Sequence, residues 1–190
     1  MLTKLVVPTF TNQLTALLAW LDKGEEHAAA QKMTVDDLLR VRLATDMFPL
    51  GTQLRFAAYL TQEAVYRLRD AEVPDEVTAI RTHGATRPDE PGSLAELRAI
   101  LAAAVALLKG VGPDELDAAA DRPLSHVLPM GMVFDMTGFA YVRDWALPQV
   151  SFHVDMAYAL LRSAGVPLGK RDYVPHMWAY LRPGTMPAAG

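Results

Sequence analysis

The chain has 190 residues, of which 51% are hydrophobic and 21% are charged, and its net charge at pH 7 is −4. We expect one domain over residues 1–190, with residues 176–190 as a disordered tail. The absence of cysteine excludes disulfides, thiolate metal sites and a cysteine nucleophile. Basic residues do not cluster, and no apolar run approaches the roughly 20 residues of a membrane span. We therefore expect a cytoplasmic protein with neither a nucleic-acid nor a membrane partner.

The first predicted helix begins near Thr9, where apolar residues follow one another at spacings of three and four over residues 10–21. Extending this stripe places Trp20 and His27 close to the same side. A short helix should follow Thr34, because an acidic residue three positions later completes a capping-box pattern.

The second long helix should begin at Asp46, a good N-cap residue, with Pro49 in its first turn. Residues 74–92 contain three prolines and two glycines, so we expect a long loop there. The third long helix should begin with a capping box at Ser93 and end at Gly110.

Residues 124–137 contain two β-prone runs around a Pro-Met-Gly-Met turn and predict a small hairpin. The last helix should cover residues 139–164, bent or split at Pro148 and stopped at Gly165. Four amphipathic helices with a hairpin before the last one predict an all-α four-helix bundle. The long connection between the third and fourth helices allows a crossover.

Polar residues inside the apolar stripes indicate where a site in the bundle would lie. Gln149 and His153 are four residues apart and share a helix face, and Gln53 lies on the same side of its helix as Asp46. We expect a small-molecule pocket lined by these groups and by aromatic residues. Its predicted residues are His27, Asp46, Gln149, His153, Trp20, Trp145 and Tyr158.

A divalent metal is one interpretation of this set, because His153, His27 and Asp46 offer the nitrogen and carboxylate ligands that suit zinc, nickel or iron. The alternative is that both histidines are hydrogen-bonded core residues and that Asp46 only caps a helix. Gln149 would then satisfy backbone groups freed by the nearby proline. Three further histidines should face solvent from a loop, the hairpin and the tail: His83, His126 and His176.

Three stretches together resemble a bacterial family of uncharacterised proteins related to the DinB/YfiT-like group. They are EEHAAAQKM (25–33), RLATDMFPLGTQLRFA (42–57) and ALPQVSFHVDMAYALLRSAGVPLGKRDY (146–173). The resemblance covers residues 10–173. It implies a DinB-like four-helix bundle with a crossed connection, often assembled as a homodimer, and a bound divalent metal such as zinc or nickel.

In typical DinB-like proteins one histidine lies on the second helix and an HxxxH pair lies on the fourth. Here Asp46 or a neighbour stands near the second-helix position, Gln149 stands where the first histidine of the pair would be, and His153 stands where the second would be. One of the three family ligands is therefore retained.

The resemblance implies two alternative functions. Some metal-bearing members act as thiol-dependent transferases or isomerases, which would make this chain a metal-dependent enzyme. His153 would then be a ligand, Asp46 a ligand or general base, and Gln149 an orienting residue. The alternative is a metal-free ligand-binding or scaffolding homodimer without catalytic activity.

Overall fold

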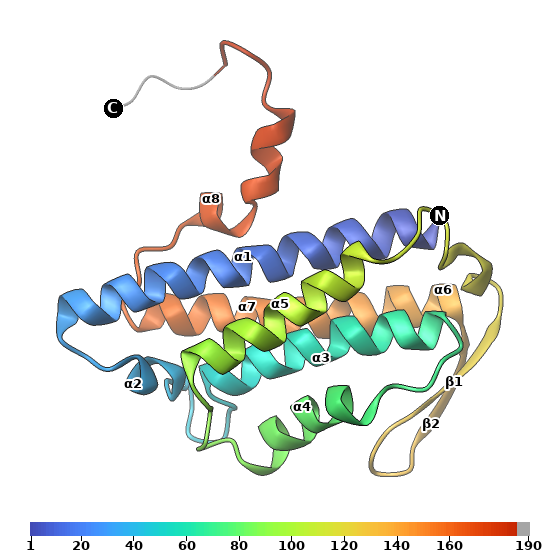
Figure 1. The fold of residues 1–190 in the computed structure, drawn as a ribbon, viewed down its shortest axis with the longest axis horizontal. Helices are drawn as coiled ribbons and strands as arrows, with labels where there is room; N and C mark the ends of the chain where they lie inside the picture. The colour runs from blue at the N-terminus through green and yellow to red at the C-terminus, as the bar shows by residue number, and fades with distance from the viewer. Residues whose placement is uncertain (186–190) are drawn as a thin grey trace.

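The computed structural model describes residues 1–185 and contains a bundle of four long helices (Figure 1). These helices are α1 (Leu2–Gln31), α3 (Leu50–Leu68), α5 (Leu94–Lys109) and α7 (Leu147–Ser163). Around the bundle they contact one another in the order α1, α5, α3, α7, and α7 closes the ring against α1. The predicted four-helix bundle with a crossover is confirmed, although the crossover lies between the second and third long helices.

This crossover is made by α4 (Asp75–Thr86), which runs back along α3 so that α3 and α5 point in the same direction (Figure 1). The prediction of a loop over residues 74–92 is therefore wrong. Pro74 is the N-cap of α4, and Pro88 and Pro91 follow its last residue, so none of the three prolines interrupts the helix.

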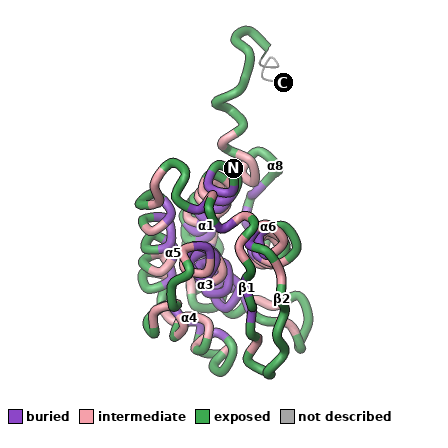
Figure 2. The backbone as a smooth tube through the Cα atoms, turned by 90° about the vertical axis from the view of Figure 1, so that its right-hand side faces the viewer, coloured by how far each residue is buried: buried purple, intermediate pink, exposed green. Residues whose placement is uncertain are grey.

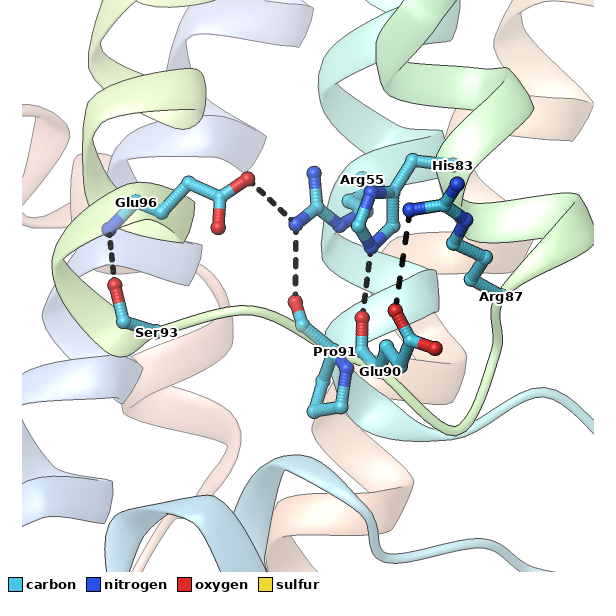
Figure 3. Close-up of polar contacts among 7 residues, drawn as sticks. All are labelled: Arg55, His83, Arg87, Glu90, Pro91, Ser93 and Glu96. Carbon is cyan, nitrogen blue, oxygen red and sulfur yellow. Dashed lines mark hydrogen bonds and ion pairs between the residues drawn. The ribbon is translucent and has the colours of Figure 1, made fainter.

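The connection from α4 to α5 is held against α3 by a buried arginine (Figure 3). Arg55 is only 2% exposed, and its Nη2 donates to the Pro91 carbonyl at 3.1 Å and to the Glu96 carboxylate at 2.7 Å. On α4, the His83 ring donates to the carbonyl of Glu90 at 2.7 Å. These contacts fix the position of α4 along one side of α3.

The N-terminal helix is longer than predicted, because α1 begins at Leu2 and continues through Pro8. Pro8 lies on the exposed side of the helix, where water can reach the carbonyl that loses its amide partner. The short helix α2 (Val35–Leu39) has the predicted capping box, in which Thr34 and Asp37 bond to each other's backbone amides.

Asp46 does not cap the second long helix. It lies in an exposed turn, and α3 begins four residues later, at Leu50, with Pro49 as its N-cap. The extended backbone of a proline fits this flanking position, and its missing amide would have no partner there.

The predicted hairpin is confirmed as β1 (Pro123–Val127) and β2 (Val133–Thr137), which pair antiparallel with His126 opposite Phe134. It follows the 3₁₀ turn η1 (Asp117–Ala119) and leads into α6 (Gly138–Ala140).

The last long helix is not split at its proline, because helical residues run without a gap from 138 to 163. Between α6 and α7 lies a stretch of π-helix, η2 (Tyr141–Ala146), and Pro148 falls in the first turn of α7, where it is tolerated. Gly165 has a φ of 90° and stops the helix as predicted.

Helix α3 lies at the centre of the molecule, and nearly all of its residues are buried (Figure 2). After α8 (Lys170–Tyr173), the 3₁₀ helix η3 (Pro175–Tyr180) and residues 181–185 project away from the bundle (Figures 1 and 2). Part of the tail that we predicted to be disordered, residues 186–190, lies outside the described residues. Within residues 1–185, no helix combines the length and the apolar character needed to cross a membrane.

Candidate functional site

Two neighbouring cavities lie along α3, and we call them together the α3 groove. The larger has a volume of about 670 Å³ and is bounded by α3, α4, the hairpin and η2. The smaller, of about 180 Å³, lies between α3, α4 and α7. They share the residues Tyr59, Leu60 and Arg81. Three predicted pocket residues line the groove: Gln149 and His153 in the smaller cavity and Trp145 in the larger.

His153 is held in one orientation by an amide on α3. The Gln53 side chain donates to the Phe48 carbonyl at 3.1 Å, so its oxygen faces His153 and accepts from the ring Nδ1–H at 2.7 Å. The Phe56 ring packs edge-on against the imidazole. Burial lowers the pKa of His153 to about 4, so the ring is neutral near pH 7 and carries its lone pair on Nε2.

His126 lies at the other end of the groove and is only 2% exposed, so the prediction that it faces solvent is wrong. Its ring packs against those of Tyr141 and Trp145, with centroids 5.4 and 4.6 Å away. Burial lowers its pKa, an effect opposed by the nearby Glu63 carboxylate. Neither ring nitrogen has a hydrogen-bond partner among residues 1–185.

A buried carboxylate lies between the two histidines. Glu63 is only 4% exposed, accepts from the Tyr59 hydroxyl at 2.9 Å, and lies 3.6 Å from Nη2 of Arg67. Burial, together with this carboxylate, raises the pKa of Tyr59. Arg81, on α4, lies over the Tyr59 ring, 5.6 Å from its centroid.

The larger cavity is unusual for its unpaired polar atoms. Nine buried side-chain nitrogens and oxygens lack a partner in the described part of the chain, and five of them belong to residues that line this cavity. These five atoms are Nδ1 and Nε2 of His126, Nε of Arg67, Nε of Arg81 and Nε1 of Trp145. Four of these five atoms are N–H groups: the two arginine Nε atoms, the indole nitrogen and one nitrogen of the neutral imidazole.

The remaining predicted pocket residues line neither cavity. Trp20 is fully buried, donates from Nε1 to the Asp172 carbonyl at 2.8 Å, and packs with Tyr158 and Tyr173. The His27 ring donates to the Ala164 carbonyl at 3.2 Å, next to the end of α7. These contacts match the interpretation of His27 as a hydrogen-bonded structural residue.

Comparisons with known proteins place this architecture in a family. The model of a domain of unknown function, DUF1993, matches residues 2–174. The chain belongs to the DUF1993 family. A crystal structure of a DinB family member protein from Shewanella denitrificans is 31% identical, with a TM-score of 0.76 over 100% of this chain and 96% of that chain. The DUF1993 chain therefore has the DinB-like fold that the sequence predicts. No curated protein matches it.

The donor groups of this DUF1993 chain do not fit a zinc or nickel site. Around His153, α3 contributes the amide of Gln53 and α7 that of Gln149, and amides are poor ligands for these metals. Of the other two predicted ligands, His27 lies on α1 beside the end of α7, and Asp46 lies in an exposed turn. Over residues 1–185, no three His, Asp or Glu side chains come together in a metal-binding arrangement.

Sequence reasoning missed His126, Glu63, Arg67 and Arg81 in the groove and Gln53 beside it, although His126 and Gln53 left a signal. Period-two alternation puts His126 on the same face of β1 as Leu124, which is buried. Gln53 shares a helix side with the predicted site residue Asp46, but the predicted site does not include it. Glu63 gave no signal, because its burial depends on α4 and the hairpin.

Proposed function

We propose that this DUF1993 protein binds a small organic molecule in the α3 groove and that it does so without a metal ion. One observation carries the proposal: among residues 1–185, five buried polar atoms without a partner belong to residues lining the larger cavity. Leaving a buried polar group without a partner costs about 1–3 kcal/mol, and a ligand that draws these side chains toward the cavity and supplies the missing partners recovers this free energy. Such a concentration is typical of a binding site rather than of a packing surface.

The donor set favours one of the two functions expected from the sequence. A metal-dependent thiol transferase or isomerase needs a ligand cluster, and this chain offers one imidazole and two amides at the expected position. The metal-free binding function needs only a cavity with unpaired groups. The homodimer stays a prediction, and a monomer mass by light scattering at micromolar concentration would contradict it.

Indole resonances offer a direct test. The chain has three tryptophans: Trp145 lines the cavity, Trp20 is buried elsewhere, and Trp178 lies in the projecting tail. In ¹⁵N-labelled protein screened against a diverse fragment library, binders should move the Trp145 indole signal and leave that of Trp20 in place. The three signals are assigned with single Trp→Phe variants.

A pair of threonines on α4 supplies the control. Thr78 lines the larger cavity and Thr82, one turn later, does not. Thr78→Phe should fill the cavity and abolish the fragment-induced shifts, whereas Thr82→Phe should leave them unchanged. A library in which no fragment moves the Trp145 signal would contradict the proposed function.

A further inference from the structure

We infer that the ligand of the α3 groove is a monocarboxylate on an apolar or aromatic frame, with its carboxylate bound by Arg81. This inference rests on the proposed function and specifies the chemical class of its ligand. Three features of the groove carry it: a guanidinium without an ion-pair partner among residues 1–185, a buried carboxylate that opposes a second negative charge on the ligand, and hydrogen-bond donors at the opposite end.

Arg81 differs from the other arginines near α3. Arg55 and Arg67 each have a glutamate partner, at 2.7 and 3.6 Å. Among the described residues, Arg81 has neither an ion pair nor a hydrogen bond, its Nε is buried, and its guanidinium lies over the Tyr59 ring. A planar guanidinium fixed over an aromatic ring presents a donor pair that matches the two oxygens of a carboxylate.

The charges around the groove limit the charge of the ligand. Arg67 is next to Glu63, and Glu72 is exposed at the rim. Of the cations lining the groove, Arg81 therefore lacks an anionic neighbour within ion-pair distance among residues 1–185. A single negative charge on the ligand would pair with it. A dianionic phosphate or phosphonate would carry its second charge into a cavity that already contains the buried Glu63 carboxylate.

The remaining residues of the groove indicate the chemistry of the ligand's frame, by which we mean the part other than its carboxylate. Its apolar lining includes Leu60, Val73 and Leu128, and the ring of Trp145 covers one side. At the far end, the indole N–H of Trp145 and both ring nitrogens of His126 have no partner among residues 1–185. An indole N–H can only donate, so the frame should carry an acceptor such as a hydroxyl or carbonyl oxygen.

The test uses four acids and their neutral or dianionic counterparts. The probes are benzoate, 3-phenylpropionate, 4-hydroxyphenylacetate and octanoate, each beside its primary amide, with 2-phenylethylphosphonate as the dianion. Dissociation constants come from titration of the Trp145 indole signal. We expect at least one acid to bind ten-fold more tightly than its amide and more tightly than the phosphonate.

Variants of the arginine complete the test. Arg81→Gln should abolish the preference for acid over amide, and Arg81→Lys, which keeps the charge without the planar donor pair, should retain part of it. Arg98→Gln is the matched control, because Arg98 pairs with Asp22 and Glu25 on α1 and does not line the groove. Circular dichroism and the Trp20 signal verify that each variant is folded.

The possible results separate failure of this inference from failure of the proposed function. Equal binding of acids and amides, tighter binding of the phosphonate, or an unchanged acid preference in Arg81→Gln would overturn the inference while leaving the proposed function intact. The same holds if no acid binds although neutral fragments from the library move the Trp145 signal. If no compound of either set moves that signal, the proposed function fails as well.

Discussion

Two clusters of side chains around tryptophans differ in whether their polar atoms are hydrogen-bonded, and this difference separates the structural part of the bundle from the candidate site. At one, Trp20 packs with Tyr158 and Tyr173, its N–H bonds to the Asp172 carbonyl, and the Tyr173 hydroxyl donates to Asp155. At the other, Trp145 packs against His126, and both the indole nitrogen and the ring nitrogens are unpaired. The difference lies in hydrogen bonding rather than in residue type.

The comparison teaches that aromatic residues placed together by sequence periodicity can have opposite roles. The first cluster ties α8 to α1 and α7 through the hydrogen bonds of Trp20, Lys23 and Tyr173, so it stabilises the fold. The second leaves buried donors without partners among residues 1–185, which destabilises the protein and, under the proposed function, is the source of its affinity for a ligand. Stability and binding measurements should therefore respond to the two clusters in opposite ways.

The largest expected effect comes from deleting each tryptophan. Trp20→Ala removes a fully buried ring and its hydrogen bond and should lower the free energy of unfolding by about 4 kcal/mol. Trp145→Ala, at a half-buried position with an unpaired N–H, should lower it by about 1 kcal/mol and abolish fragment binding. Urea denaturation measures both, and equal losses would contradict the comparison.

His153 should make the unfolding free energy depend on pH. Its pKa is about 4 in the folded protein against 6.5 in the unfolded chain, so the unfolded chain binds more protons between these values. Stability should therefore fall as the pH is lowered from 6.5 to 4. Between pH 7 and 4.5, this residue should account for about 2 kcal/mol of the loss.

The control for this prediction is His153→Asn, whose amide can donate to Gln53 without titrating. The wild-type protein should lose about 2 kcal/mol more than this variant between pH 7 and 4.5 in urea denaturation. Parallel pH profiles for the two proteins would show that the folded imidazole titrates normally.

A smaller effect on the free energy of unfolding is expected at the connection from α4 to α5. Glu96→Gln removes the negative charge that pairs with buried Arg55, and it should lower the free energy of unfolding by about 1–2 kcal/mol, because the glutamate itself is half exposed. Glu90→Gln, whose carboxylate lies 4.0 Å from exposed Arg87, should change it by less than about 0.5 kcal/mol. Thermal denaturation of the two variants side by side checks this difference.

No change at all is expected for metal content. Protein purified without a chelator should contain substoichiometric zinc and nickel by elemental analysis, and His153→Ala should not alter that content, because the surrounding donors are amides. Near-stoichiometric metal in the parent protein together with none in the variant would assign His153 as a ligand after all.

The sequence predicts the four long helices, the hairpin and the short capped helix, because periodicity and capping are local properties. The sequence-based prediction fails at α4. We treated every proline of residues 74–92 as a helix breaker, but Pro74 precedes the helix and Pro88 follows it. The prediction also fails to separate Trp20 from Trp145. Which polar atoms find partners depends on contacts between distant elements, and these appear only when α4 and the hairpin are in place.

The π-helical segment Tyr141–Ala146 has a consequence for how this family can vary. Gly138 is fixed against the Ala119 carbonyl, where a Cβ atom would lie only 2.1 Å away, and His153 is fixed against Gln53. An α-helix turns by about 100° per residue, so inserting or deleting one residue in its regular turns would rotate one of these anchors out of place. A π-helical turn, with i→i+5 hydrogen bonds, holds one residue more than an α-helical turn and can take up such a change. An alignment of DUF1993 sequences should therefore confine any gap between residues 138 and 153 to the π-helical segment.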